Sequence, residues 1–451
     1  MRSRTNVTVI GVGNMGLPIA CHFAGRGAKV IACDKQAAVV EAINSGICPS
    51  QEPGLAELLL LAVKRGDLQA MADTRAAVAA SEVVVVIVPV LLSPEKEADT
   101  TIIESVCQEI GQSINPDTMV CFESTMPVGG VRGLLPLLES GGLKPGRDFD
   151  VVVSPERVKS GYVLKNLAKT PKVVAGITAD ATSRAAAFYF EYLGAPIITM
   201  ESMEAAELVK LAGMIYRDVN IALSNELARY ADAVCVDIAS VIKAANTDGE
   251  ACLLSPGIGV GGHCTPVYPH FLIMDAERRG RPARLAETGR RINEDQPAYV
   301  LNQVERSWGS LHSVPVLIAG LGFRPEVKES RYSPAWILRD LLLKRHAQVN
   351  LHDPLYTSEE IQALGFVPGE LNDGPAPQVL ILNTAHGAYR NLDFAELSAR
   401  GLKVVVDGRN FFNRQQVEQT GILYLGIGQP SKVSCAATAA AHTIAPPVHL
   451  I

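Results

Sequence analysis

The sequence lacks the features that mark nucleic-acid-binding, membrane-spanning and secreted proteins. It has no basic run or stripe, and its formal net charge is −6, which argues against nucleic acid as a partner. The longest apolar run near the N-terminus, residues 83–92, is too short to cross a bilayer and contains Pro89. No signal peptide precedes the first predicted strand, near Val7. We therefore expect a cytoplasmic protein without a membrane or nucleic-acid partner, in which a few placed arginines would suffice for an anionic substrate.

Paired cysteines and aromatic residues are also scarce. The nine cysteines form an odd set without paired spacing, and most lie in apolar surroundings, so we expect reduced thiols. Aromatic residues make up only 5% of the chain, and Ala, Val, Leu and Gly dominate, which suits buried parallel strands covered by helices. A chain of 451 residues has room for roughly two to four domains.

Strand patterns alternate with helical patterns in two separate stretches of the chain. In the first stretch, β-branched apolar runs end in turn residues at 7–13, 29–34, 83–89, 119–124 and 150–156. From about residue 201 to residue 306 the spacing is helical and strand signals stop, and alternation returns at 314–322, 347–354, 378–384 and 403–410. We predict an α/β fold with two Rossmann-like domains, each a doubly wound parallel sheet, joined by a long helix. The expected boundaries are 1–200, a helical region at 201–306, 307–430, and a flexible tail at 431–451.

The first glycine motif predicts a dinucleotide site. Gly11, Gly13 and Gly16 follow a predicted strand and open a helix, as a tight turn, a close approach to pyrophosphate and close helix packing require. Asp34 ends the second predicted strand, where its carboxylate can accept both ribose hydroxyls and would repel a 2′-phosphate. This pattern favours NAD over NADP. The alternative is a glycine turn of an α/β fold that holds no cofactor.

The second glycine motif is incomplete. Gly320 and Gly322 follow a strand, but Arg324 and Pro325 come next and no third glycine is placed to open a helix. The pattern argues against a second full cofactor site. It leaves open a site for the nucleotide part of a substrate, or a purely structural turn.

A glycine-rich loop and one lysine are candidates for chemistry. Residues 257–262 contain four glycines and precede His263 and Cys264; such a loop can wrap around a ligand and hold a thiol nucleophile beside it. The alternative is a buried inert thiol. Lys210 lies on an otherwise apolar helical stretch, where it can stabilise an oxyanion or simply reach solvent.

These motifs together resemble the UDP-glucose/GDP-mannose dehydrogenase family. The resemblance runs from about residue 5 to 425 and rests on GVGNMGLP, ESTMPVG, SPERV, KLAGMIYRDVNIALSNE, GVGGHCTPVYPHFL and GLGFRPEVKESRYSP. The GGHC sequence is similar to the branch that oxidises UDP-N-acetylhexosamines, typified by UDP-N-acetylmannosamine dehydrogenase. The resemblance implies an NAD-binding first domain, a central dimerisation region, a nucleotide-sugar-binding last domain and a homodimer.

The resemblance also implies a mechanism. Two hydride transfers to NAD would convert the sugar C6 alcohol to a carboxylate, with Cys264 holding the carbon as a thiohemiacetal and then a thioester. Lys210 would stabilise the C6 oxyanion, Thr125 would order water near the nicotinamide, and Glu156 would lie near the reacting sugar. No metal is implied.

The implied binding residues form two sets. The cofactor set is Gly11, Gly13, Asn14, Met15, Gly16, Asp34, Pro89, Thr125 and Arg331. The substrate set is Glu156, Arg157, Val158, Lys210, Arg217, Asn220, Gly261, His263, Tyr268, Phe323, Arg324 and Arg409.

Several positions depart from the family pattern. Met214 stands where the family has an asparagine and Tyr268 where it has an aspartate, and losing such groups costs about 10²-fold in rate each. Other positions that differ from the family residues are Val90, Arg324, Tyr332 and the pair Lys328-Glu329.

Four functions fit these departures: full oxidation, a single two-electron oxidation, other redox chemistry on a nucleotide sugar, and non-catalytic binding. A hydroxyacid or 6-phosphogluconate type dehydrogenase is a further alternative, but it needs neither the GGHC loop nor a second Rossmann-like domain. The sugar, the nucleotide and the pathway are not fixed by the sequence.

Overall fold

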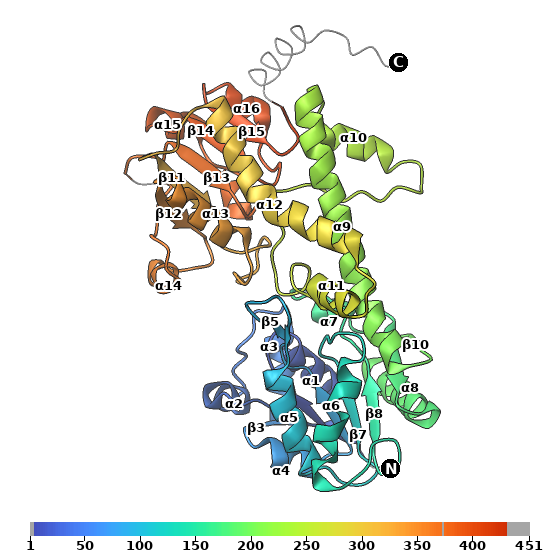
Figure 1. Cartoon of the computed structure of the whole chain (residues 1–451). Helices are drawn as coiled ribbons and strands as arrows, with labels where there is room; N and C mark the ends of the chain where they lie inside the picture. Colours follow the sequence, from blue (N-terminus) through green and yellow to red (C-terminus); the bar gives the residue numbers. More distant parts are fainter. Residues whose placement is uncertain (1–3, 372–373, 431–451) are drawn as a thin grey trace, which may run out of the picture. The chain divides into compact units, whose positions relative to one another are not determined.

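The computed structural model describes residues 4–371 and 374–430; the predicted tail at 431–451 lies outside them. The chain divides into two compact units. The first unit comprises Met1–Gly213 and His270–Pro282, and the second comprises Met214–Pro269 and Ala283–Ile451. Each unit is built on its own β-sheet (Figure 1).

The first unit contains an eight-stranded sheet in the order β10-β9-β8-β7-β4-β1-β2-β3. All neighbouring strands are parallel except β8 and β9. The strands are β1 (Asn6–Ile10), β2 (Lys29–Cys33), β3 (Leu68–Met71), β4 (Val83–Val86), β7 (Met119–Phe122), β8 (Asp150–Val153), β9 (Lys172–Gly176) and β10 (Ile197–Thr199). A short antiparallel hairpin joins β5 (Leu91–Leu92) and β6 (Ala98–Asp99).

Helices cover this sheet because its central strands are apolar on both faces. Every residue of β4 and β7 is buried, as expected for parallel strands between two helical layers. The helices are α1 (Gly16–Gly25), α2 (Ala37–Asn44), α3 (Leu55–Lys64), α4 (Thr74–Ala79), α5 (Thr101–Gly111), α6 (Gly130–Leu138), η1 (Glu139–Gly141), α7 (Val163–Asn166) and α8 (Ala179–Leu193). The strand order reverses beside β1, so the loops after β1 and β4 meet at the edge where α/β sheets bind ligands.

The second unit contains a five-stranded parallel sheet in the order β12-β11-β13-β14-β15. The strands are β11 (Pro315–Ala319), β12 (Gln348–His352), β13 (Val379–Leu382), β14 (Val404–Asp407) and β15 (Leu423–Gly426). Its shorter helices are α10 (Ile238–Ala245), α13 (Pro334–Lys344), α14 (Ser358–Ala363), η2 (Gly387–Tyr389), α15 (Phe394–Ala399) and α16 (Arg414–Glu418).

Four helices lie in the predicted helical region: α9 (Met203–Val234), α10, α11 (Tyr268–Arg278) and α12 (Arg284–Ser307). Within the second unit, α9 and α12 meet through buried polar groups. Arg290 pairs with Asp218 at 2.9 Å, and Asn293 donates to Asp218 and accepts from Asn225. A Cβ on Gly289 would lie 3.2 Å from Val219, so a glycine there allows the helices to approach closely.

The predicted fold class is confirmed, with the antiparallel β8–β9 pair as a difference. Cys235 is disulfide-bonded, so the expectation of reduced thiols is wrong at this residue. Within residues 4–371 and 374–430, no helix is both long and apolar enough to span a membrane.

Candidate active site

In the first unit, the glycine loop after β1 forms a tight turn with an open outer face. Gly11 has φ +93°, and a Cβ on it would lie 2.7 Å from the carbonyl oxygen of Ile87. A Cβ on Gly16 would lie 1.9 Å from the carbonyl oxygen of Gly11, so α1 starts directly against the turn. Nothing lies within 4 Å of a Cβ at Gly13, and Asn14 beside it is exposed. The loop therefore leaves room for a pyrophosphate at the start of a helix.

Asp34 lies beside this loop, as predicted. Its Oδ2 accepts from the backbone N–H of Val12 at 3.2 Å, and its Oδ1 accepts from that of Gln36 at 3.0 Å. Asp34 is half-buried, and a carboxylate has about four acceptor positions, so it can also accept ribose hydroxyls. The loop, the helix start and Asp34 together fit NAD.

The loops after β4 and β7 lie next to each other in the same unit. The Ser124 hydroxyl donates to the carbonyl oxygen of Val88 at 2.7 Å, which ties the two loops together. Thr125 is buried and Pro89 is exposed. Val90, which stands where the family has a threonine, is buried at 5% exposure, so its side chain takes part in packing.

The loop after β8 brings two predicted site residues together. Lys210 Nζ donates to the backbone carbonyl of Glu156 at 2.5 Å. The Glu156 carboxylate accepts from the backbone N–H groups of Arg157 at 2.6 Å and Val158 at 2.7 Å. Glu156 thereby holds the conformation of its own loop. The Arg157 guanidinium donates to the carbonyl oxygen of Pro171.

A buried cluster of charged side chains, Lys172, Glu123 and Glu156, lies next to this loop. Lys172 lies 2.8 Å from Glu123 and 3.3 Å from Glu156, and Tyr189 donates to Glu123 at 2.8 Å. Burial raises the pKa of Glu123 to about 7, although Lys172 opposes the rise. Burial acts against the charge of Glu156 too, but Lys172 and the backbone of Val158 lower its pKa overall.

In the second unit, the glycine-rich loop before Cys264 packs against the loop after β11. A Cβ on Gly261 would lie 2.5 Å from the Cβ of Phe323, and one on Gly262 would lie 2.8 Å from the Phe323 ring. The backbone N–H of Gly262 donates to the carbonyl oxygen of Arg331 at 3.1 Å. Only glycine fits under Phe323, and this places the predicted substrate residues Gly261 and Phe323 in contact.

Arg409 joins the same loop from the end of β14. It donates to the carbonyl oxygen of Asn383 at 2.7 Å and to that of Gly259 at 3.2 Å. Burial lowers its pKa to about 10, and Asp407 opposes this. Its NH2 is buried without a hydrogen-bond partner among the described residues. A buried guanidinium nitrogen with an unused donor suits an anionic ligand.

Cys264 is half-buried, and its carbonyl oxygen accepts from the backbone N–H of Tyr268 at 2.9 Å. His263 hydrogen-bonds to Cys264, and its Nδ1 lies 2.8 Å from Glu329 Oε1. These two bonds raise the pKa of His263 to about 10 against the effect of burial. A thiol beside a positively charged imidazole is favoured as a thiolate.

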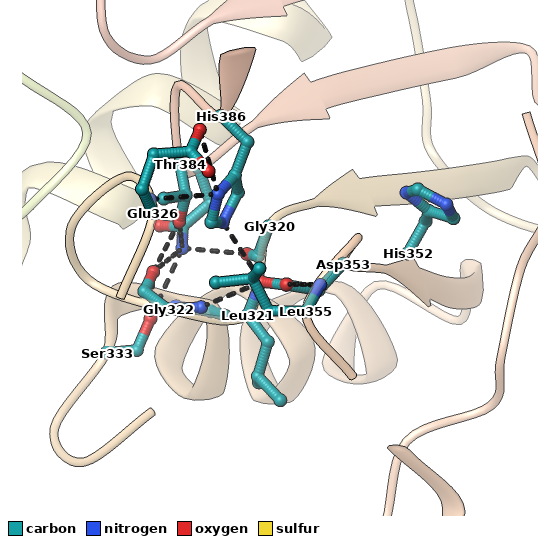
Figure 2. A network of polar contacts seen from close by, with 12 residues as sticks. Gly320, Leu321, Gly322, Glu326, Ser333, His352, Asp353, Leu355, Thr384 and His386 are labelled. Atoms are coloured by element: carbon teal, nitrogen blue, oxygen red, sulfur yellow. Dashed lines mark hydrogen bonds and ion pairs between the residues drawn. The ribbon is translucent and has the colours of Figure 1, made fainter. Parts of the chain in front are cut away.

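The second glycine loop, at Gly320–Gly322, is held by hydrogen bonds to the buried carboxylate of Asp353 (Figure 2). Asp353, at the end of β12, accepts from the backbone N–H groups of Leu321 at 2.6 Å and Gly322 at 3.2 Å. It is 2% exposed, and His386 Nε2 lies 3.3 Å away. A Cβ on Gly320 would lie 2.3 Å from Thr384 Cβ. Asp353 therefore holds the turn from inside, whereas Asp34 in the first unit is half-exposed, and this difference supports a structural turn.

Comparison with known proteins agrees with this geometry. Three family models match the chain: the NAD-binding domain of the UDP-glucose/GDP-mannose dehydrogenase family at residues 5–193, its central domain at 204–295 and its UDP-binding domain at 317–414. The chain belongs to the UDP-glucose/GDP-mannose dehydrogenase family. It is therefore a member of a family of NAD-dependent UDP-sugar dehydrogenases.

Individual relatives in this family match most of the chain. UDP-N-acetyl-D-mannosamine dehydrogenase of Yersinia pestis is 32% identical over 75% of this chain and 83% of its own length. That of Pyrococcus horikoshii is 29% identical over 94% of this chain and 99% of its own. The structure of the Pyrococcus enzyme has a TM-score of 0.86 at 28% identity, covering 94% of this chain and 99% of its own. A UDP-glucose dehydrogenase from Pyrobaculum islandicum has a TM-score of 0.84 at 28% identity, covering 94% and 98%.

The remaining family positions are distributed within the second unit. Asn220 donates to the carbonyl oxygen of Cys252 at 2.7 Å and accepts from the backbone N–H of Leu254 at 2.8 Å, so it fixes the segment before the glycine-rich loop. Arg217 is half-buried on α9. The Arg324 guanidinium lies 5.9 Å from the centre of the Phe323 ring. Tyr268, in place of the family aspartate, is 9% exposed.

Three polar residues that were not predicted lie beside family positions in the structure. Glu123 lies in the ESTMPVG motif, and Glu329 is one of the positions that depart from the family pattern. Nothing in the sequence marked either residue as part of a site. Lys172 precedes an apolar run and gave no signal. Their partners, Glu156 and His263, are too distant in sequence for spacing to reveal.

Proposed function

We propose that the protein oxidises the C6 alcohol of a UDP-linked hexose or N-acetylhexosamine to the uronic acid by two successive hydride transfers. The relatives' names support a UDP-N-acetylhexosamine, since two of them are UDP-N-acetyl-D-mannosamine dehydrogenases. NAD, when bound, accepts the hydride in each oxidation. The chain's own residues supply the nucleophile, the charge stabilisation and the binding contacts.

One observation carries this proposal. The second unit holds a half-buried thiol at the end of a glycine-rich loop, and the same loop contacts Phe323 and the buried guanidinium of Arg409. An aldehyde cannot release a second hydride until its carbon becomes tetrahedral. The Cys264 thiolate meets this requirement by adding to the carbon, and Arg409 offers a donor for a diphosphate oxygen.

Lys210 and Thr125 complete the assignment in the first unit. Lys210 is 7% exposed, and its ammonium group is already positioned by the Glu156 carbonyl. We assign it to stabilise the oxygen on C6 as negative charge develops. Thr125, buried after β7, is assigned to water near the nicotinamide.

The proposal is tested by NADH formation with a panel of UDP- and GDP-sugars, followed by product mass. Full oxidation gives two NADH per sugar and a product about 14 Da heavier than the substrate. One NADH and a product about 2 Da lighter would mean a single oxidation. No turnover with any sugar, despite binding of NAD and nucleotide sugar, would refute the enzymatic proposal in favour of a binding protein.

Single oxidation is the second candidate. Tyr268 and Met214 stand where the family has an aspartate and an asparagine, and Tyr268 is buried. The site therefore lacks a carboxylate and an amide that, in the family, assist the C6 oxygen, the water and proton transfer around the cysteine.

We also propose a homodimer through α9. In the second unit, its residues Tyr216, Leu223 and Tyr230 are spaced seven apart and are 59%, 44% and 66% exposed. Apolar residues at this spacing form one seam along a helix. A second copy of this chain is the partner that a self-complementary seam fits.

A further inference from the structure

The unexplained feature of the second unit is a carboxylate, an imidazole and a thiol joined in series. His263 Nδ1 lies 2.8 Å from Glu329 Oε1, and the His263 side chain also hydrogen-bonds to Cys264. The Glu329 side chain is 13% exposed and the His263 side chain 31% exposed. A nucleophile, a base in contact with it and a third group that orients the base are the arrangement that activates nucleophiles in many enzymes.

The backbone fixes this series rather than leaving it to side-chain rotation. Glu329 lies on the loop after β11, whose Phe323 N–H donates to the Glu329 carbonyl at 3.3 Å. The same loop covers Gly261 and Gly262 with Phe323 and binds the N–H of Gly262 through Arg331. The two segments carrying Glu329 and His263 are thus locked to each other within one unit.

The charges around His263 favour its protonated form. The hydrogen bonds to Cys264 and Glu329 raise its pKa to about 10 despite burial. The loop after β11, which packs against the glycine-rich loop, carries the cationic residues Lys328 and Arg331. Lys328 is paired with Glu360 at 2.6 Å, and Arg331 is exposed. Glu329 is the carboxylate in contact with the ring.

We propose that His263, positioned by Glu329, is the acid–base partner of Cys264 and replaces the carboxylate lost at Tyr268. This proposal rests on the proposed function, in which Cys264 attacks an aldehyde. In the resting pair the S–H bond is already broken and the proton forms an N–H bond on the imidazole, so the electron pair lies on sulfur before the aldehyde arrives. The sulfur–carbon bond then forms as the carbonyl electron pair moves to oxygen. Loss of the hydride from C6, for which bound NAD would be the acceptor, then gives the thioester. When water adds to the thioester carbon and the carbon–sulfur bond breaks, the electron pair leaves on sulfur and the imidazolium returns its proton to that sulfur. The two protons of the water are released to solvent, one from the tetrahedral adduct and one from the carboxylic acid.

The test measures the reactivity of Cys264 without any sugar. The full-length protein carrying Cys252→Ser, which removes the exposed free thiol, is treated with iodoacetamide across a pH series. Mass spectrometry follows alkylation of the Cys264 peptide. We expect the rate to rise with an inflection well below the ordinary thiol value of about 8.5.

His263→Gln and Glu329→Gln are introduced into the same background, with the exposed His312→Gln as control. We expect both variants to raise the inflection by at least about one pH unit and to slow alkylation at neutral pH by about 10-fold. His312→Gln should match the parent, and Glu329→Asp should recover part of the loss. An ordinary inflection in the parent, or one unchanged in both variants, overturns the proposal.

The readout separates this inference from the proposed function. If no sugar is oxidised but the inflection shifts as expected, the proposed function fails and the activated thiol stands. If sugars are oxidised but the inflection does not move, the acid–base pair is wrong and the dehydrogenase stands. Thermal unfolding of each variant is measured alongside; should His263→Gln fail to fold, Glu329→Gln and Glu329→Asp decide the question.

Discussion

Removing the ammonium group of Lys172 should destabilise the core of the first unit in a pH-dependent way. Lys172 Nζ lies 2.8 Å from Glu123 and 3.3 Å from Glu156, and the three side chains are 6%, 1% and 10% exposed. Replacing one partner of a buried ion pair costs about 3–5 kcal/mol because the other charges remain without compensation. Lys172→Met leaves two carboxylates facing each other, so we expect a loss of at least about 3 kcal/mol near pH 8.

The pH dependence follows from Glu123. Burial raises its pKa to about 7 in the native protein, and Lys172 opposes that rise, so the variant has a still higher value. A carboxyl group with a raised pKa in the folded state contributes stability below its unfolded value, about 4.3, and loses it as the pH rises through the folded pKa. The penalty of Lys172→Met should therefore be small at pH 5 and large at pH 8.

Hydrogen exchange measures the loss of stability locally in the first unit. Tryptophan fluorescence would not, because the two tryptophans, Trp308 and Trp336, both lie in the second unit. Peptides covering β7, β8 and β9 should exchange about 100-fold faster in Lys172→Met than in the parent at pH 8, which corresponds to about 3 kcal/mol. The exposed Lys169→Met is the matched control. A variant-to-parent ratio below about threefold, or one equal at pH 5 and pH 8, would refute the reasoning.

Three further outcomes are expected. Asp34→Ala should weaken NAD binding by about 10- to 100-fold in titration calorimetry, because hydrogen bonds to a charged group contribute about 1.5–3 kcal/mol; unchanged affinity contradicts the assignment. Gly262→Ala should raise KM for the nucleotide sugar at least about 10-fold while NAD affinity stays the same. The reason is that Gly262 has φ +95° and that its added Cβ would lie 2.8 Å from the Phe323 ring. Leu223→Glu should convert the proposed dimer to a monomer in light scattering; a monomeric parent or a dimeric variant would refute the α9 seam.

The first-unit sheet was predictable where burial on both faces leaves a continuous apolar run. Val83–Val86 and the neighbouring strands met this condition. The edge strands β3 and β10 did not, because β3 alternates with the exposed Gln69 and two of the three β10 residues are exposed. The antiparallel β9 was missed because its short apolar run follows a helix of only four residues, α7.

The site was predictable where its residues are local in sequence. Gly11, Gly13 and Asp34 belong to one βαβ unit, so their spacing carries the geometry. The pairing of His263 with Glu329 spans 66 residues and depends on a glycine loop fitting under Phe323. No periodicity in one sequence encodes such a contact, and only the packed structure reveals it.

The most direct test of the proposed chemistry is the product formed by the parent and by Cys264→Ser with the best UDP-sugar of the panel. We predict the uronic acid and two NADH per sugar from the parent, and at least about 100-fold slower acid formation from Cys264→Ser. Acid formed by Cys264→Ser at the parental rate would contradict a role for this thiol in carrying the carbon to the acid.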